Sequence, residues 1–293
     1  MNDLANLHRE FRRFCSLEEG LAGRTVKAME MSFGTFLRRT GLKELNEVSE
    51  ATLREFFYEG REKYQWSQSH YSNNHKYLKR FMGWCVQRGL RKDNPLEVIK
   101  RPKAAQPLPR RLTGEDARKI LYGSFTLPWR YEFEQTRNHA IISTFLFTGL
   151  RMSELLNLEL TDVDLKNRSI LVRHGKGNKD RWVPIHYKLV RTLSQYSKTR
   201  LKATTPWFFP GKQGGKLTPK NLSKICKRIG QHTGVRFTCH QLRHTFGSVS
   251  VEQGLGIVQL KEIMGHSNLA STMIYLKMSA KSLEEGVNRL ELF

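Results

Sequence analysis

Cysteine is scarce in this sequence, with four residues among 293, at Cys15, Cys85, Cys226 and Cys239. No two of them have C-x-x-C spacing, and no zinc-finger pattern is present. Cys239 is followed directly by His240, but the side chains of adjacent residues on a helix point in different directions. We therefore interpret all four cysteines as reduced structural thiols and expect no metal site built on them.

Long apolar runs are also missing. No segment approaches the ~18 consecutive apolar residues that a membrane-spanning helix needs. The first residues, MNDLANLHREFRRF, lack the apolar core of a signal peptide. We therefore expect a cytoplasmic protein that associates with the nucleoid and has no membrane partner.

Acidic residues are few compared with basic ones, because 27 Asp and Glu stand against 50 Lys and Arg, for a net charge of +23. This excess favours a polyanionic partner, with nucleic acid first and an acidic membrane surface second. The chain is 39% hydrophobic and 10% aromatic, which indicates a folded protein rather than a basic disordered tail. Its length predicts about two domains.

A nucleotide-binding phosphate loop is absent as well. The spacing from Gly211 to Gly215 is one residue short of a Walker A motif, and Leu217 stands where that motif requires Ser or Thr. We therefore expect no ATP site and no cofactor. The segment is interpreted as a turn-rich connection that leads to a helix capped near Thr218.

The first hundred residues show helical spacing of apolar side chains, which predicts four short amphipathic helices in a small bundle. The positions are Leu4, Leu7, Phe11 and Phe14; Met29, Phe33, Phe36 and Leu37; Leu53, Phe56 and Phe57 after a Ser49 cap; and Leu78, Phe81, Trp84 and Cys85 before Gly89. Lys and Arg lie between these positions. Because the excess is of one sign, we interpret it as phosphate contact rather than an ordinary solvated face.

A basic segment with three prolines follows, Pro102, Pro107 and Pro109, and predicts an extended linker. Thr113 then has the character of a helix N-cap, with acidic residues in the first turn. We therefore predict a helical domain over 1–102, a linker over 103–112 and a second domain over 113–293.

Two clusters in the second domain carry residues suited to phosphate chemistry. In the first, Gly149 ends an apolar helix, and Arg151 starts a new one with Glu154 following. Two strand-like runs, 170–173 and 181–185, come next. The segment HGKGNKD joins them and predicts a β-hairpin with Lys176 on its basic tip.

The second cluster lies between His240 and Tyr275. His240 and Arg243 are three residues apart, so on a helix they share a face and can converge on one anion. Gly265 ends an apolar helix, Ser267 is predicted to cap the next, and His266 lies in the turn between them. Tyr275 follows, and a tyrosine nucleophile needs nearby cations because its free pKa is about 10.

Each of these residues also has a structural interpretation. A single Tyr late in an amphipathic helix usually packs against the core. His240 and His244 have the spacing of a metal pair, but Gln241 replaces the Glu of a zinc hydrolase helix and no third ligand is evident. We therefore expect no metal.

Together the motifs resemble the tyrosine recombinases, the group that includes Xer-type resolvases and phage and transposon integrases. The matching positions are Arg151 in TGLRMSEL, Lys176 in GKGNKDRWVP, His240 and Arg243 in HQLRH, His266 in MGHSN, and Tyr275. All six are filled in order by the expected residue types. The resemblance covers about the C-terminal two thirds by motif, and the first third by layout only.

The resemblance implies a mainly α fold with a small β-sheet in the catalytic domain, and a two-domain clamp around double-stranded DNA whose helical N-terminal domain binds the core site. It implies a site-specific recombinase in which Tyr275 forms a 3′-phosphotyrosyl ester, without metal or ATP. Arg151 and Arg243 would hold the phosphate, Lys176 would protonate the leaving oxygen, and His240 would assist proton removal while hydrogen-bonding the phosphate with His266. The terminal stripe from Leu283 to Phe293 either packs on its own domain or docks into a neighbour within a tetramer on DNA.

Two other functions stay open from the sequence. A type IB topoisomerase uses similar chemistry, although TGLRMSEL and MGHSN match the integrase side. A DNA-binding or regulatory module with an unused site is the other alternative, and the six intact signature residues argue against it. The sequence does not define the target site, the accessory proteins, or whether the reaction serves integration, excision or resolution.

Overall fold

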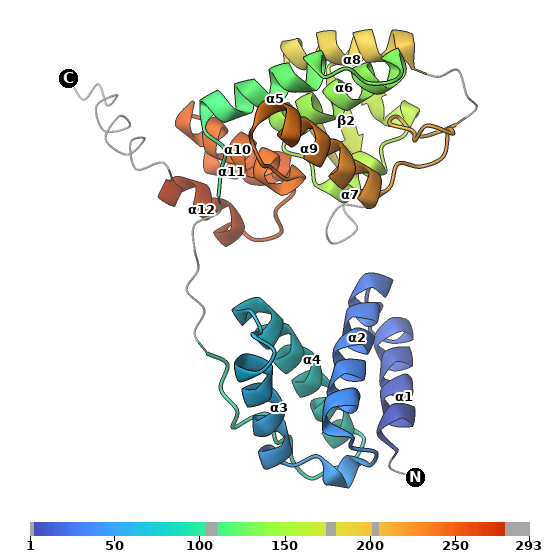
Figure 1. Cartoon of the computed structure of the whole chain (residues 1–293), viewed down its shortest axis with the longest axis vertical. Coiled ribbons are helices and arrows are strands. Elements are labelled where there is room, and N and C mark those ends of the chain that lie inside the picture. Colours follow the sequence, from blue (N-terminus) through green and yellow to red (C-terminus); the bar gives the residue numbers. More distant parts are fainter. Residues whose placement is uncertain (1–2, 103–109, 174–179, 201–204, 279–293) are drawn as a thin grey trace, which may run out of the picture. The chain divides into compact units, whose positions relative to one another are not determined.

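The computed structural model describes residues 3–102, 110–173, 180–200 and 205–278, and it divides the chain into two compact units, 1–106 and 107–293 (Figure 1). The division falls within the segment predicted as a linker. Among the described residues, no helix has both the length and the apolar character needed to cross a membrane.

The described residues of the first unit, 3–102, form four α-helices: α1 (Leu4–Leu17), α2 (Gly23–Thr40), α3 (Glu50–Glu62) and α4 (Gln68–Gln87). A short 3₁₀ turn, Leu45–Glu47, precedes α3. The side chain of Ser49 accepts from the backbone N–H of Thr52, so the predicted N-cap of α3 is confirmed. The predicted four-helix arrangement of this region is therefore confirmed.

Aromatic side chains fill the core of the first unit. Phe33 packs edge-on against Phe81, with ring centroids 4.9 Å apart, and stacks on His8 at 3.8 Å. Burial lowers the pKa of His8 to about 3, and the charge of Arg12 adds to this effect. His8 is therefore a neutral core residue.

The second unit combines helices with one small sheet. Its helices are α5 (Gly114–Thr126), α6 (Glu132–Thr148), α7 (Met152–Leu156), α8 (Tyr187–Thr199), α9 (Pro219–Thr233), α10 (Cys239–Glu252), α11 (Ile257–Met264) and α12 (Ala270–Met278). Helix α6 is buried over most of its length and packs against α5, α8 and α10. Thr113 and Thr218 accept hydrogen bonds as the N-caps of α5 and α9, as predicted.

The sheet has the order β1 (Val163–Asp164), β2 (Ser169–Val172) and β3 (Arg181–Pro184), with antiparallel pairing throughout. A 3₁₀ turn, Leu160–Asp162, precedes β1. Ile170 pairs with Val183 and both are buried, whereas Trp182 on the other face is exposed. The hairpin register places Arg181 opposite Val172, next to the tip. The fold is thus mainly α with a small sheet, as the resemblance implied.

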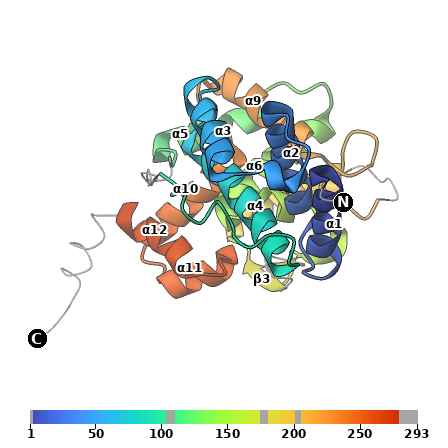
Figure 2. The ribbon, with the colours of Figure 1, turned by 90° about the horizontal axis from the view of Figure 1, so that it is seen from below.

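Helices α10, α11 and α12 form a separate small core. Val251, Leu260, Met264 and Tyr275 are buried together, from α10, α11 and α12. Figure 2 shows these helices side by side. The C-cap Gly265 ends α11 in the left-handed conformation, with φ of 64°, as predicted.

The prediction that Ser267 caps the next helix is wrong. Helix α12 begins at Ala270, whose backbone N–H donates to the side-chain oxygen of Asn268 at 2.9 Å. Residues 266–269 instead form the bend that turns His266 back toward α10. A capping side chain is present, but one position later than the sequence suggested.

Candidate active site

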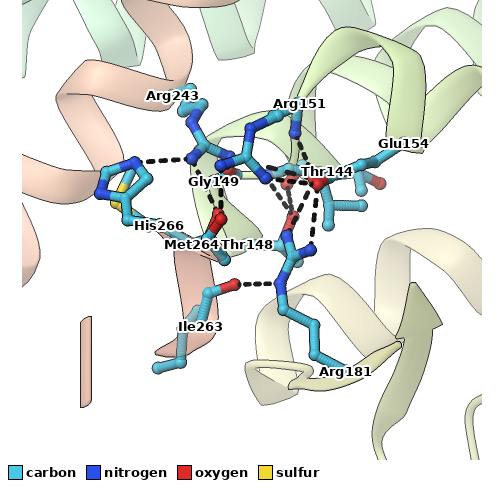
Figure 3. Close-up of polar contacts among 12 residues, drawn as sticks. Thr144, Thr148, Gly149, Arg151, Glu154, Arg181, Arg243, Ile263, Met264 and His266 are labelled. Atoms are coloured by element: carbon cyan, nitrogen blue, oxygen red, sulfur yellow. Dashed lines mark hydrogen bonds and ion pairs between the residues drawn. The ribbon is translucent and has the colours of Figure 1, made fainter. Parts of the chain in front are cut away.

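A buried carboxylate organises the site. Glu154, in the first turn of α7, accepts hydrogen bonds from the backbone N–H of Arg151 at 2.8 Å and from the Arg151 side chain at 2.7 Å. Arg181, at the start of β3, donates both terminal nitrogens to the same carboxylate, at 2.9 and 2.8 Å. Figure 3 shows these contacts converging on Glu154. One carboxylate therefore fixes arginines from two separate elements.

Glu154 is ionised in this environment. Burial alone would raise the pKa of its carboxyl group, but the hydrogen bonds and charges of Arg181 and Arg151 outweigh burial and lower that pKa to about 2. Arg243 lies 4.0 Å from the same carboxylate. Three guanidinium groups around one carboxylate leave an excess of positive charge in this cluster, which favours an anionic ligand.

Arg151 and Arg243 are held by backbone carbonyls. Arg151 donates to the carbonyl of Gly265 at 2.5 Å, and Arg243 donates to those of Gly149 at 2.5 Å and Met264 at 2.8 Å. Burial and the charge of Arg151 lower the pKa of Arg243 to about 10, so it stays protonated at neutral pH. Both glycines end helices in the left-handed conformation, and these turns bring their carbonyls to the arginines.

His266 is a neutral residue in a defined tautomer. Its Nε2 lies 2.8 Å from Arg243, which can only donate, so Nε2 must accept. Its Nδ1 therefore carries the proton and donates to the hydroxyl of Thr272 at 2.9 Å. Burial and the charges of Arg243 and Arg151 lower the pKa of His266 to about 4, in agreement with this assignment.

Tyr275 is 1% exposed. Its hydroxyl lies 3.0 Å from Nδ1 of His244, and its ring is nearly parallel to that of His266, at an interplanar angle of 12°. Burial and the charges of His240 and Arg243 lower the pKa of His244 to about 4. His244 is therefore neutral at pH 7, and the tyrosine hydroxyl can donate to it.

Burial raises the pKa of Tyr275, although Arg243 and Arg151 oppose this effect. The hydroxyl is therefore protonated at neutral pH in this conformation. The ring lies directly against Gly247 of α10, where a Cβ atom would come within 2.6 Å of the ring. Glycine at this position is what allows Tyr275 to pack so closely on α10.

His240 lies one turn before His244 on α10, with the two rings edge to face and their centroids 4.3 Å apart. The His240 residue is exposed. Partial burial of its ring and the charge of Arg243 lower its pKa. His240 is thus the most exposed histidine of this group.

The structure brings five of the six predicted site residues into one region, namely Arg151, His240, Arg243, His266 and Tyr275. Lys176 lies outside the described residues, although the strands that flank its segment pair as predicted. Within the described part of the chain, no group of three or more His, Cys, Asp or Glu is arranged to hold a metal ion.

Sequence reasoning missed two contacts in this site. Arg181 was interpreted only as a strand residue, yet it binds Glu154 and donates its Nε to the carbonyl of Ile263 at 2.9 Å. His244 was considered only as a metal partner of His240, yet it is the residue bonded to the tyrosine hydroxyl. Two sequence features could have indicated these contacts. Arg181 is a basic residue directly after the hairpin tip, and His244 is a histidine one turn past His240.

The chain is similar to a known protein family and to named relatives. The family model described as the phage integrase family matches residues 110–282. The tyrosine recombinase XerA of Pyrococcus horikoshii is 36% identical over 203 residues, which is 68% of this chain and 68% of XerA. The tyrosine recombinase XerD of Rhizobium meliloti is 28% identical over 305 residues, covering 98% of this chain and 96% of XerD.

Solved structures share the fold. The site-specific recombinase XerH bound to difH substrate, a pre-cleavage complex, superposes with a TM-score of 0.74 at 22% identity, covering 98% of this chain and 85% of XerH. The Tn1549 transposon integrase in complex with a circular intermediate DNA gives 0.76 at 19% identity, covering 99% of each chain. At these identities the likeness concerns the fold.

Replacing Glu154 by Gln removes the buried charge that the arginines share. We expect a loss of about 3–5 kcal/mol in the free energy of unfolding at neutral pH, because buried guanidinium groups lose their counter-charge. The difference from wild type should shrink as pH falls from 4.5, the carboxyl's ordinary pKa, toward about 2, where the wild-type carboxylate takes up its proton. Urea unfolding at a series of pH values measures this.

The exposed Glu115, paired with Lys119 on the surface of α5, supplies the control for that series. Glu115→Gln should change the free energy of unfolding very little at any pH. A Glu154→Gln difference that stayed constant from pH 7 to the acid limit would contradict the proposed ionisation of Glu154.

A methyl group at position 247 should expel the tyrosine ring. In Gly247→Ala the new Cβ would overlap Tyr275, so we expect a less stable protein in which the pKa of Tyr275 falls toward its ordinary value of 10.0. The ultraviolet absorbance difference between Gly247→Ala and Gly247→Ala/Tyr275→Phe, followed against pH, isolates this one hydroxyl. Gly83→Ala in α4, where the nearest atom to the new Cβ is 3.7 Å away, is the matched control and should be neutral or stabilising.

Proposed function

We propose that Tyr275 is the nucleophile with which this protein exchanges DNA strands. The premise is that the chain belongs to the phage integrase family and is a tyrosine recombinase. The enzyme cuts and rejoins DNA at specific sites. The observation that carries the residue assignment is the cluster of Arg151, Arg243 and His266 around one turn, with the Tyr275 ring beside His266. It combines fixed cations with a phenol, which phosphoryl transfer to a tyrosine requires.

The two arginines would hold the scissile phosphate. Both arginines are already oriented by backbone carbonyls, and Arg151 is also bonded to Glu154. Arg243 is 4% exposed, so the movement that uncovers Tyr275 would also have to open a path to this guanidinium group. Positive charge that is fixed in advance is most effective where negative charge grows in the transition state. We assign the non-bridging phosphate oxygens to these two residues. We assign a further hydrogen bond to His266, whose Nδ1–H would exchange the Thr272 hydroxyl for a phosphate oxygen.

We assign the proton of Tyr275 to the histidines of α10. The sequence suggested His240 as the acceptor, but the Tyr275 hydroxyl lies 3.0 Å from Nδ1 of His244. His244 is therefore the first acceptor in this proposal. His240, exposed and in contact with the His244 ring, is assigned to the phosphate and to proton exchange with solvent.

The nucleophile must become accessible before it reacts. With Tyr275 1% exposed, a DNA phosphate cannot reach its hydroxyl, since in-line attack needs the two atoms within about 3.5 Å. We infer that α12 shifts when DNA binds, which uncovers the ring and brings the hydroxyl, still hydrogen-bonded to His244, toward Arg151 and Arg243. Storing the tyrosine protonated and covered would prevent unproductive cleavage.

The reaction proposed is a balanced transesterification. The Tyr275 oxygen bonds to phosphorus as the bond to the 5′ oxygen breaks, and Lys176 supplies the proton that the leaving oxygen needs. A 3′-phosphotyrosyl ester and a free 5′ hydroxyl result. The 5′ hydroxyl of a partner strand then attacks the ester and releases Tyr275, so neither metal nor ATP is required.

The remaining assignments are proposals of the same kind. The first unit would bind the core DNA site and close with the second as a clamp, because its basic side chains lie between the buried apolar positions of its helices. Four protomers would assemble on DNA through the terminal segment 281–293, which lies outside the described residues. The enzyme would act on nucleoid DNA in the cytoplasm.

Tyr275→Phe should bind site DNA normally and form no covalent adduct. A nicked substrate traps the wild-type ester, and gel electrophoresis in SDS then measures the protein that stays on the DNA. Tyr187→Phe, which alters an exposed tyrosine on α8, is the control and should form the adduct at the wild-type level. An adduct formed by Tyr275→Phe would identify a different nucleophile.

Lys176→Ala tests the leaving-group proton. On ordinary DNA we expect cleavage to slow by about 10²–10⁴-fold, the usual contribution of a general acid. On a substrate with sulfur in place of the 5′ oxygen the loss should nearly vanish, because a thiolate leaves without a proton. Lys188→Ala on α8 serves as the control, and an equal loss on both substrates would remove Lys176 from this role.

A further inference from the structure

The fold brings together two cysteines that the sequence separates. Cys226 lies on α9 and Cys239 is the first residue of α10, and their sulfur atoms are 3.6 Å apart. We propose that this pair is a redox modification site, at which a small disulfide such as glutathione disulfide closes a reversible Cys226–Cys239 bond beside the catalytic helix.

The surrounding backbone keeps the two sulfurs close. Five residues, 234–238, connect α9 to α10, and Gly230 lies so near the carbonyl of Val235 that a Cβ would come within 2.8 Å of its oxygen. A disulfide has an S–S distance of about 2.05 Å, so the sulfurs need to approach by roughly 1.5 Å. Packing therefore already holds the two ends of the loop between Cys226 and Cys239 close together, before any bond joins them.

The two thiols are chemically unequal. Cys239 is half-buried and begins α10, where free backbone N–H groups favour a thiolate. The hydrogen bond from Cys226 and that from the backbone of Cys239 itself lower the pKa of Cys239, although burial opposes them. The same contact with Cys239, together with burial, raises the pKa of Cys226. Cys239 is thus the attacking thiol, and buried Cys226 is the resolving thiol.

The exchange balances in two steps. The Cys239 thiolate attacks one sulfur of glutathione disulfide, whose S–S bond breaks and releases one glutathione. Cys226 then loses its proton and attacks the Cys239 sulfur, which releases the second glutathione. Two protein thiols are oxidised, and one glutathione disulfide is reduced to two glutathione molecules.

The bond would act on the residues that follow Cys239, a consequence that rests on the proposed function. His240 is the next residue, and Arg243 is anchored to the carbonyls of Gly149 and Met264. With the helix fixed at Arg243, drawing Cys239 toward α9 displaces the first turn and His240 with it. A displacement of about 1 Å in a catalytic group costs up to about 100-fold in rate, so we expect the oxidised enzyme to cleave DNA at least tenfold more slowly.

Mass spectrometry of the whole chain tests the site. The folded protein is treated with glutathione disulfide and then denatured in urea with N-ethylmaleimide, which reaches the buried free thiols, and it is digested without reductant. We expect a cross-linked peptide containing Cys226 and Cys239, its loss after dithiothreitol, and full blocking of Cys15 and Cys85. In Cys226→Ser, glutathione should remain on Cys239. Full alkylation of both Cys226 and Cys239 in the oxidised wild type would overturn the proposal.

Strand cleavage on a nicked substrate tests the consequence. Oxidised wild type should be slow and recover with dithiothreitol, whereas Cys226→Ser/Cys239→Ser should cleave equally fast before and after oxidation. An enzyme that carries the cross-link yet keeps its rate would overturn the link to the reaction. If the reduced enzyme fails to cleave DNA, the proposed function is wrong. The mass-spectrometry result then still decides whether the Cys226–Cys239 bond forms.

Discussion

The site depends on the ion pairs between the buried carboxylate of Glu154 and the surrounding arginines. Its buried carboxylate holds Arg151 through two hydrogen bonds and Arg181 through two more, and lies 4.0 Å from Arg243. Guanidinium groups are cations, so placing three of them together inside the protein requires an anion. The carboxylate thereby joins the start of α7, the hairpin strand β3 and, through the arginines, the turn after α11.

This arrangement separates the fixed and the movable parts of the reaction. The arginines are held by carbonyls at helix ends, and Arg151 is also bonded to the buried carboxylate, so the orientation of both guanidinium groups is set before a phosphate binds. Tyr275 is held differently, by one hydrogen bond to His244 and by contact with Gly247. Because neutral His244 and the buried tyrosine keep the proton in place, attack by Tyr275 would depend on movement of α12.

The elements of the fold were predictable from local patterns. Apolar periodicity and capping residues such as Ser49 and Thr113 located the helices, and alternation around the basic tip located the hairpin. The contact of Arg181 with Glu154, 27 residues away, and the approach of Cys226 to Cys239 were not predictable, because they arise from packing of elements and leave no period in the sequence. The prediction that Ser267 caps α12 was wrong because the next residue, Asn268, has a side chain that can accept the same kind of hydrogen bond, and it is the one that does so.

The most direct test of the account is to identify the residue that carries DNA. Wild-type protein is trapped on a nicked substrate, denatured in SDS and digested with trypsin, and the peptide attached to DNA is sequenced by mass spectrometry. We predict a single peptide that contains Tyr275, joined to the 3′ phosphate of the cut strand. Attachment at another residue, or to a 5′ phosphate, would contradict the central claim that the cluster around Glu154 activates a phosphate for attack by Tyr275.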